Sequence, residues 1–147
     1  MRHAREARVW AEAIRAAVVS RYLDDLAPEF RPLAIELIAR CVEAGYMVLI
    51  VDTLRTPAEH QANLANGVSW TPRSRHLTGH AIDIDPFEQY QLHGPDKVSW
   101  DATDPVWRKI GAIGEGLGLR WGGRWAQRDM GHFEYVPPLP STDTVRV

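Results

Sequence analysis

The chain has 147 residues, of which 45% are hydrophobic and 24% charged, and its formal net charge is −2. This length suits one compact domain with a hydrophobic core, so a single domain over residues 1–147 is expected. The charge argues against a basic surface for nucleic acid, and no stretch has the roughly 20 apolar residues of a membrane span. The single cysteine, Cys41, excludes an internal disulfide and any multi-cysteine zinc site.

Two amphipathic helices are predicted in the first third of the chain. Apolar residues recur at helical spacing over residues 4–19, within a helical N-terminal extension that covers residues 1–21. This segment lacks the uninterrupted apolar run of a signal peptide, so we expect the protein to begin in the cytoplasm. The second helix begins at Pro32 and ends at Gly45, residues typical of helix starts and stops.

A strand, a short helix and a loop are predicted next. Residues 46–51 form a continuous apolar run that is typical of a buried strand. Thr56 can cap a short helix that ends at Gly67, which places Arg55 at the corner between strand and helix. Residues 68–78 carry the Ser, Pro, Arg and Gly residues of a loop.

The sequence AIDIDP is the clearest strand signal. Asp83 and Asp85 fall on one face of an alternating segment, and Ile82 and Ile84 fall on the other. Pro86 is expected to end this strand. The segment therefore has one polar face for chemistry and one apolar face for the core.

The remainder of the chain predicts one more helix and one more strand. Residues 87–101 show little periodicity, residues 104–118 have helical spacing, and residues 131–136 form a strand. Residues 137–147 are rich in proline and polar residues and are expected to be loosely ordered. The predicted fold is α+β, with a small antiparallel sheet that carries the site and packs against several helices.

Candidate metal ligands gather in two segments. They are His76, His80, Asp83 and Asp85 in SRHLTGHAIDID, and Asp129, His132 and Glu134 in DMGHFEY. His76 and His80 are spaced like the histidines of a helical HExxH site, but Leu77 stands where that motif has its glutamate. Gly79 also disfavours a helix, so a helical zinc motif is rejected.

A bend can bring three of these side chains together. On a helix His76 and Asp83 would lie about 10 Å apart, whereas two ligands of one zinc ion lie about 3 Å apart. Gly79 gives the chain freedom to turn between them. His132, which enters a strand after Gly131, would supply the third ligand and leave a fourth position for water, as in catalytic zinc sites.

Asp129 and Arg55 are the candidates for catalysis. Asp129 precedes His132 by three residues and is placed to reach the attacking water rather than the metal. Arg55 could stabilise the oxyanion, although its local sequence alone favours a surface arginine at a helix entry.

The other histidines are not expected to bind the metal. His80 falls on the same face of the predicted strand as Ile82 and Ile84, which favours packing or contact with a neighbouring ligand. We expect His3, His60 and His93 to be solvated or incidental.

The two histidine segments resemble motifs of one peptidase family. SRHLTGHAIDI is similar to the SxHxxGxAxD motif of the zinc peptidases related in fold to D-Ala-D-Ala carboxypeptidases, dipeptidases and the hedgehog signalling domain. DMGHFEY resembles their acid-x-x-His motif. The similarity covers roughly residues 48–135 and is strongest to the phage endolysins that cut the L-alanyl-D-glutamate bond of peptidoglycan.

This resemblance implies a role for each matching residue. It implies that His76, Asp83 and His132 bind zinc, that Asp129 is the catalytic base and that Arg55 stabilises the transition state. Many relatives have glutamate where Asp129 stands, and the shorter acid must approach more closely to do the same work.

Further positions match substrate contacts. Ser74 and Gln61 correspond to residues that flank the motifs and contact substrate. The segment WGGRW resembles the aromatic stretch before the last ligand, so Trp121 and Trp125 could grip a peptide or sugar. Packing in the core is an equally good interpretation for Trp121 and a weaker one for Trp125.

The resemblance implies a monomeric phage or prophage endolysin that acts on the peptidoglycan stem peptide. Such an enzyme would be stored in the host cytoplasm and reach the wall through a holin-type pore. One alternative is a D-Ala-D-Ala dipeptidase or carboxypeptidase. A second alternative is a zinc-containing binding domain without catalysis.

Overall fold

The computed structural model describes residues 20–67, 71, 73–88, 97–98 and 101–138. Its elements are the short 3-10 helices η1 (Leu23–Asp25), η2 (Arg75–Thr78) and η3 (Gly122–Arg124), the helices α2 (Arg31–Glu43), α3 (Pro57–Ala65) and α4 (Val106–Gly116), and the strands β1 (Val48–Asp52), β2 (Ala81–Glu88), β3 (Lys97–Val98), β4 (Arg120–Trp121) and β5 (His132–Glu134). The predicted helix over residues 4–19 and nearly all of the predicted tail lie outside the described residues.

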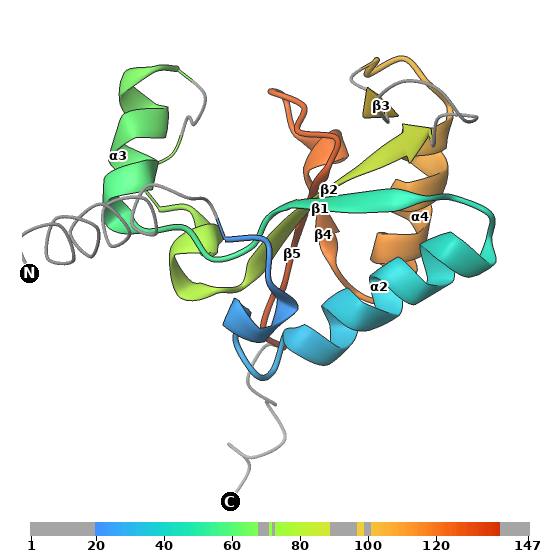
Figure 1. Cartoon of the computed structure of the whole chain (residues 1–147), viewed down its shortest axis with the longest axis horizontal. Coiled ribbons are helices and arrows are strands. Elements are labelled where there is room, and N and C mark those ends of the chain that lie inside the picture. The colour runs from blue at the N-terminus through green and yellow to red at the C-terminus, as the bar shows by residue number, and fades with distance from the viewer. Residues whose placement is uncertain (1–19, 68–70, 72, 89–96, 99–100, 139–147) are drawn as a thin grey trace, which may run out of the picture.

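The strands form one antiparallel sheet. Its order is β1-β2-β5-β4, and β3 pairs with β2 beyond this path. Asp83, on the inner strand β2, faces Asp52 of β1 on one side and His132 of β5 on the other. Figure 1 shows α2 and α4 side by side at one end of the sheet and α3 at the other. The predicted α+β fold is therefore confirmed.

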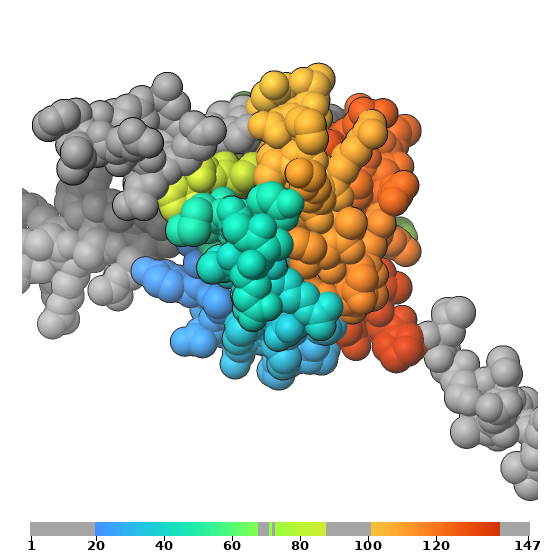
Figure 2. All heavy atoms as spheres, turned by 90° about the vertical axis from the view of Figure 1, so that its right-hand side faces the viewer, coloured from blue at the N-terminus to red at the C-terminus, as the bar shows by residue number. Residues whose placement is uncertain are grey.

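The hydrophobic core lies between the sheet and the helices α2 and α4. Figure 2 shows these two helices in contact along one side of the molecule. Ile82 and Ile84 are fully buried, as the alternation in AIDIDP predicted. The buried cluster consists of Leu26, Phe30, Ala34, Leu37, Cys41, Ile82, Ile84, Trp107, Ile110, Leu119, Trp121 and Phe133.

The ends of several helices follow the expected residues. The Thr56 hydroxyl accepts a hydrogen bond from the Glu59 backbone, and the Glu59 carboxylate accepts one from the Thr56 backbone, so α3 begins with a complete capping box. Asp104 accepts a hydrogen bond from Val106 at the start of α4. None of the helices in the described residues is long and apolar enough to span a membrane.

Two strand predictions were wrong. β1 is an edge strand rather than a buried one, and Leu49 remains 39% exposed, because β1 pairs only with β2 among the described strands. Pro86 does not end β2, which continues to Glu88. Pro86 lies opposite Val48, and Phe87 supplies the next backbone hydrogen bond to Met47, so the strand tolerates the missing N–H of proline.

Close packing between α4 and β5 favours glycine at position 114. A Cβ at this position would overlap the ring of Phe133, whereas Gly116 on the same helix has open space around it. We expect Gly114→Ala to lower the free energy of unfolding by about 1–3 kcal/mol through overpacking. Gly116→Ala should leave it unchanged or raise it by up to about 1 kcal/mol. Urea unfolding checks this prediction, and equal stability of the two variants would contradict it.

Candidate metal centre

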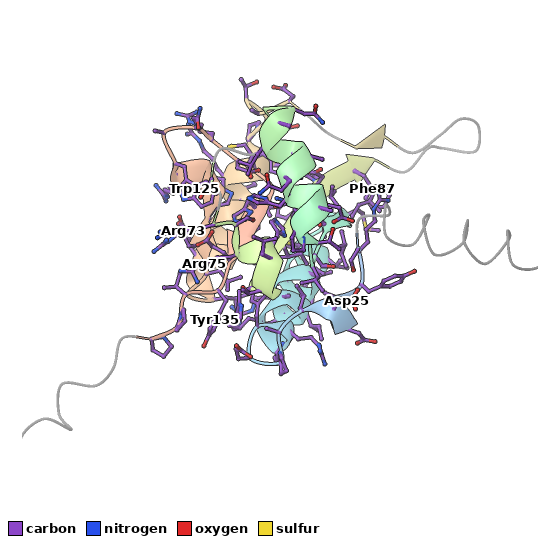
Figure 3. The ribbon with its side chains drawn as sticks, turned by 90° about the vertical axis from the view of Figure 1, so that its left-hand side faces the viewer. Asp25, Arg73, Arg75, Phe87, Trp125 and Tyr135 are labelled. Carbon is purple, nitrogen blue, oxygen red and sulfur yellow. The ribbon has the colours of Figure 1, made fainter. Side chains whose placement is uncertain are left out.

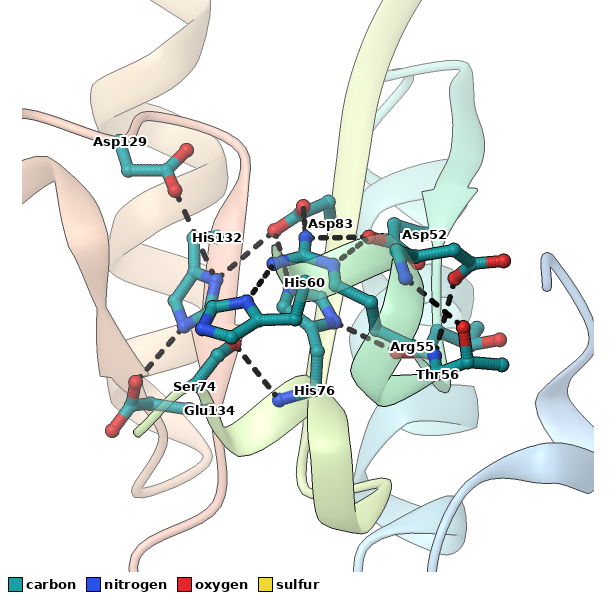
Figure 4. Close-up of polar contacts among 12 residues, drawn as sticks. Asp52, Arg55, Thr56, His60, Ser74, His76, Asp83, Asp129, His132 and Glu134 are labelled. Carbon is teal, nitrogen blue, oxygen red and sulfur yellow. Dashed lines mark hydrogen bonds and ion pairs between the residues drawn. The ribbon is translucent and has the colours of Figure 1, made fainter. Parts of the chain in front are cut away.

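Three side chains from different elements converge beside the sheet. His76 comes from η2, Asp83 from β2 and His132 from β5, and one ligand atom of each lies within 4.8 Å of the others. The Asp83 Oδ1 atom is 3.1 Å from His76 Nε2 and 3.0 Å from His132 Nδ1. Both imidazoles are buried. Figure 4 shows the carboxylate between the two rings.

A tight turn delivers His76 to this cluster. The Ser74 hydroxyl accepts a hydrogen bond from the His76 backbone at the start of η2. Gly79 ends η2 in the left-handed region, with φ 75°, and a Cβ there would lie 2.9 Å from the Ala27 backbone nitrogen. Only glycine fits both requirements easily. The bend expected at Gly79 is therefore present, and a 3-10 turn precedes it.

The imidazole contacts leave one nitrogen of each ring facing Asp83. His76 Nδ1 donates to the Thr53 carbonyl oxygen at 2.7 Å. His76 Nε2 is buried and makes no well-aligned hydrogen bond to the described residues, although it lies 3.1 Å from Asp83 Oδ1. Such atoms are rare in folded proteins unless a ligand binds them. An imidazole nitrogen of this kind beside a carboxylate and a second imidazole fits a metal ion.

Glu134 orients the second imidazole. His132 Nε2 donates to the Glu134 carboxylate at 2.9 Å, which turns Nδ1 toward Asp83. Glu134 in turn pairs with Arg75 at 2.8 Å. Burial opposes protonation of His132, but its contacts with Asp83 and Glu134 outweigh that effect and raise the pKa of His132 to about 10.

Sequence reasoning included Glu134 among the candidate ligands but gave it no role. Because Glu134 is two residues after His132 in a strand, the two side chains share a face. That spacing was the available signal.

The Arg55 side chain is largely enclosed rather than on the open surface. Its side chain is 10% exposed, and Nη2 lies 2.6 Å from the Asp52 carboxylate and 3.9 Å from that of Asp83. The neighbouring His60 is also buried, with Nδ1 3.5 Å from Arg55 Nη1 and Nε2 2.6 Å from the Thr71 carbonyl oxygen. The expectation that His60 is solvated or incidental was wrong, because its ring is 2% exposed and contacts the Thr71 carbonyl.

Asp129 lies next to the cluster without joining it. Its Oδ2 atom is 4.0 Å from His132 Nδ1, and its side chain remains 40% exposed. The backbone N–H of Asp129 donates to the Gly122 carbonyl at 3.0 Å, which fixes the carboxylate at the edge of the site. Partial burial and the nearby negative charge of Asp83 raise the pKa of Asp129. The Asp129 carboxylate therefore accepts a proton more readily than an ordinary aspartate does.

A cavity of about 220 Å³ opens over the cluster. It is lined by the three converging residues and by Arg55, Thr71, Arg73, Ser74, Arg75, Trp125, Asp129 and Glu134. The Trp125 ring lies 4.9 Å from the His132 ring, so Trp125 forms part of the cavity wall. Trp121 instead packs in the core and donates to the Met130 carbonyl at 2.7 Å.

Two other residues singled out from the sequence lie elsewhere. Gln61 is exposed on α3 and is not among the residues that line this cavity. His80 lies outside the metal cluster, where Nε2 is 2.6 Å from the Glu29 carboxylate and Nδ1 is 2.7 Å from the Thr78 hydroxyl.

The contact between Glu134 and His132 predicts an effect on metal binding. Partners of this kind hold a metal-ligating imidazole in its orientation, and their loss typically weakens metal affinity by about 10- to 100-fold. We expect Glu134→Gln to lower zinc affinity by at least about tenfold. Chelator competition measures this affinity. Glu36→Gln, which removes an exposed carboxylate on α2, is the matched control, and equal affinities of the two variants would contradict the role of Glu134.

Known proteins are similar to this chain in sequence and in fold. A family model described as D-alanyl-D-alanine carboxypeptidase matches residues 67–135. The chain is similar to the L-alanyl-D-glutamate peptidase of Listeria phage A118, with 32% identity over 124 residues that cover 83% of this chain and 42% of the relative. It is also similar to the L-alanyl-D-glutamate peptidase of Escherichia phage T5, with 31% identity over 114 residues that cover 71% of this chain and 76% of the relative.

The fold is similar to that of a solved structure. The crystal structure of the Serratia marcescens L-Ala D-Glu endopeptidase ChiX matches with a TM-score of 0.61 and 25% identity, over 81% of this chain and 89% of that one. The chain spans less than half the length of the Listeria phage relative but about three quarters of the phage T5 relative. By its sequence and its fold, the chain belongs to the M15 peptidase family, together with these phage peptidases.

Proposed function

We propose that this protein is a zinc-dependent endopeptidase that hydrolyses the L-alanyl-D-glutamate bond in the stem peptide of peptidoglycan. The observation that carries the proposal is the convergence of His76, Asp83 and His132 beside the carboxylate of Asp129 in an open cavity. The choice of bond is supported by the phage and Serratia proteins named for it.

The donor set supports zinc as the metal. Two imidazole nitrogens and one carboxylate oxygen are typical of catalytic zinc sites, which keep a further position open. When bound, zinc would supply Lewis acidity and make a water molecule acidic enough to attack near neutral pH. In this proposal His76 and His132 bind through the nitrogens that face Asp83.

Asp129 is assigned the role of general base and general acid. Its raised pKa suits a carboxylate that takes a proton from the attacking water and returns it to the leaving amine. Because Asp129 is partly exposed at the cavity edge, its carboxylate is accessible to the attacking water and to the leaving amine.

Arg55 is assigned to the developing negative charge on the scissile carbonyl. Asp52 and His60 hold its guanidinium in place beside Asp83, so no reorganisation is needed when that charge forms. Ser74 and Trp125 line the cavity and are assigned to substrate contact. Gln61 could contact only a part of the wall polymer outside the cavity.

The relatives support a biological setting for the proposed activity. Because two of them are phage proteins, we place the reaction in the release of phage from its host. In this proposal the protein stays in the host cytoplasm until a holin-type pore admits it to the wall.

The cleaved bond can be identified from the products. Digestion of intact sacculi should release stem peptides with a new N-terminal D-glutamate and leave L-alanine on the glycan strand. Mass spectrometry distinguishes these products from free D-alanine. Release of D-alanine with the Ala–Glu bond intact would favour a D-Ala-D-Ala dipeptidase or a D-Ala-D-Ala carboxypeptidase, of which the second is the activity named by the matching family model.

The two proposed roles of the site can be separated by mutation. Asp129→Asn should keep zinc bound and lower kcat by about 100- to 10,000-fold, because it removes the proton acceptor. His76→Ala should lose both zinc and activity. Zinc content and hydrolysis are measured on the same preparations. Undiminished hydrolysis by the zinc-loaded Asp129→Asn variant would remove Asp129 from the mechanism.

A further inference from the structure

Arg73 is the one arginine of the cavity that the described residues leave without a carboxylate partner. Arg55 pairs with Asp52 at 2.6 Å, and Arg75 pairs with Glu134 at 2.8 Å. Arg73 is exposed, and its backbone N–H donates a hydrogen bond to the Thr71 hydroxyl at 3.1 Å. Figure 3 shows Trp125, Arg73 and Arg75 in succession along one side of the molecule, where all three line the cavity.

The charges around the cavity make this free guanidinium significant. Three carboxylates line the cavity, those of Asp83, Asp129 and Glu134. These carboxylates repel an anionic group of a substrate, so binding of such a group requires a nearby cation. Arg75 is engaged by Glu134, and Arg55 is held by Asp52 beside the cluster. Arg73 therefore provides an available positive charge at the cavity rim.

The proposed substrate carries an anion close to the scissile bond. The residue on the leaving side is glutamate, which has two carboxyl groups. In a stem peptide the γ-carboxyl continues the chain, so the α-carboxyl is left as a free acid or as an amide. That group is attached to the same carbon as the scissile nitrogen. It must therefore enter the cavity whenever the scissile carbonyl lies at the metal cluster.

We infer, on the basis of the proposed function, that Arg73 binds the α-carboxylate of D-glutamate and makes the enzyme prefer stem peptides with the free acid over those with the α-amide. The planar guanidinium can donate two parallel hydrogen bonds to a carboxylate. A carboxamide offers one neutral oxygen and an NH2 group that cannot accept from arginine. Arg73 is thus a specificity residue, and Asp129 and Arg55 remain the catalytic ones.

Two synthetic peptides that differ only at this group test the inference. Both contain L-alanine, D-glutamate linked through its γ-carboxyl, and L-lysine, and the α-group is either a free acid or an amide. The zinc-loaded full chain should cleave the acid with a kcat/KM about 10- to 100-fold higher than the amide. Arg73→Gln should lose most of this preference by slowing cleavage of the acid alone, and Arg73→Lys should keep part of it.

The control is Arg40→Gln, which removes one exposed arginine from α2, away from the cavity. It should keep the wild-type preference. Equal rates on the two peptides in the wild type, or a loss in Arg73→Gln that is the same for both, would overturn the inference while leaving the proposed function intact. Failure of the wild type to cut either peptide at the Ala–Glu bond would refute the proposed function, and the inference with it. Unchanged thermal unfolding shows that Arg73→Gln is folded.

Discussion

The site depends on the contacts of the Asp83 carboxylate with the imidazoles of His76 and His132. Asp83 lies on the inner strand β2, with the β1 and β5 strands on either side, and it faces two imidazoles and a guanidinium. Burial alone would raise the pKa of Asp83, but the positive charge of His76 and His132 and the hydrogen bond from His132 hold the pKa of Asp83 well below its usual range. A largely enclosed carboxylate is tolerated because it is paired in this way. The strand register that places Asp83 opposite His132 therefore also assembles the site.

Each group around Asp83 has its own fixed partner in the fold. The Thr53 carbonyl, just after β1, holds His76, and Glu134 on β5 holds His132. Asp52, at the end of β1, holds Arg55. These partners are on or next to the sheet, so the nitrogen atoms that face Asp83 are oriented by one backbone carbonyl and two carboxylates of the fold, and this orientation does not depend on the metal. This arrangement favours a rigid site of the kind that catalysis needs.

The sequence predicted the features that depend on local pattern. The alternation in AIDIDP gave the correct faces for Ile82 and Ile84, and Thr56 and Gly67 marked the limits of α3. Contacts between segments that are distant in the sequence could not be predicted from local pattern. The exposure of β1 depends on which strands lie beside it, and the burial of His60 depends on a loop carbonyl eleven residues away.

The two acids of β2 show the same limit within a single strand. Asp83 and Asp85 have equivalent positions in the alternation, yet burial and the nearby carboxylates of Asp83 and Asp129 raise the pKa of Asp85 to about 7. Asp83 has imidazole partners and Asp85 has none among the described residues. The pattern identifies the face of the sheet that carries acids, and the contacts decide which acid can hold a metal.

Residues 73–76 combine side chains that are fixed against the sheet with one side chain that is not. His76 and Arg75 are neighbours in η2, and they bind Asp83 and Glu134 on two adjacent strands. These two contacts, with the Ser74 hydroxyl at the start of the turn, fix η2 against the sheet. Arg73 directly precedes the fixed turn but has no charged partner of its own among the described residues. Because the backbone next to Arg73 is fixed, less conformational entropy is lost when the Arg73 side chain binds a ligand. In the proposed mechanism, the turn that positions His76 therefore also presents the Arg73 side chain at the cavity.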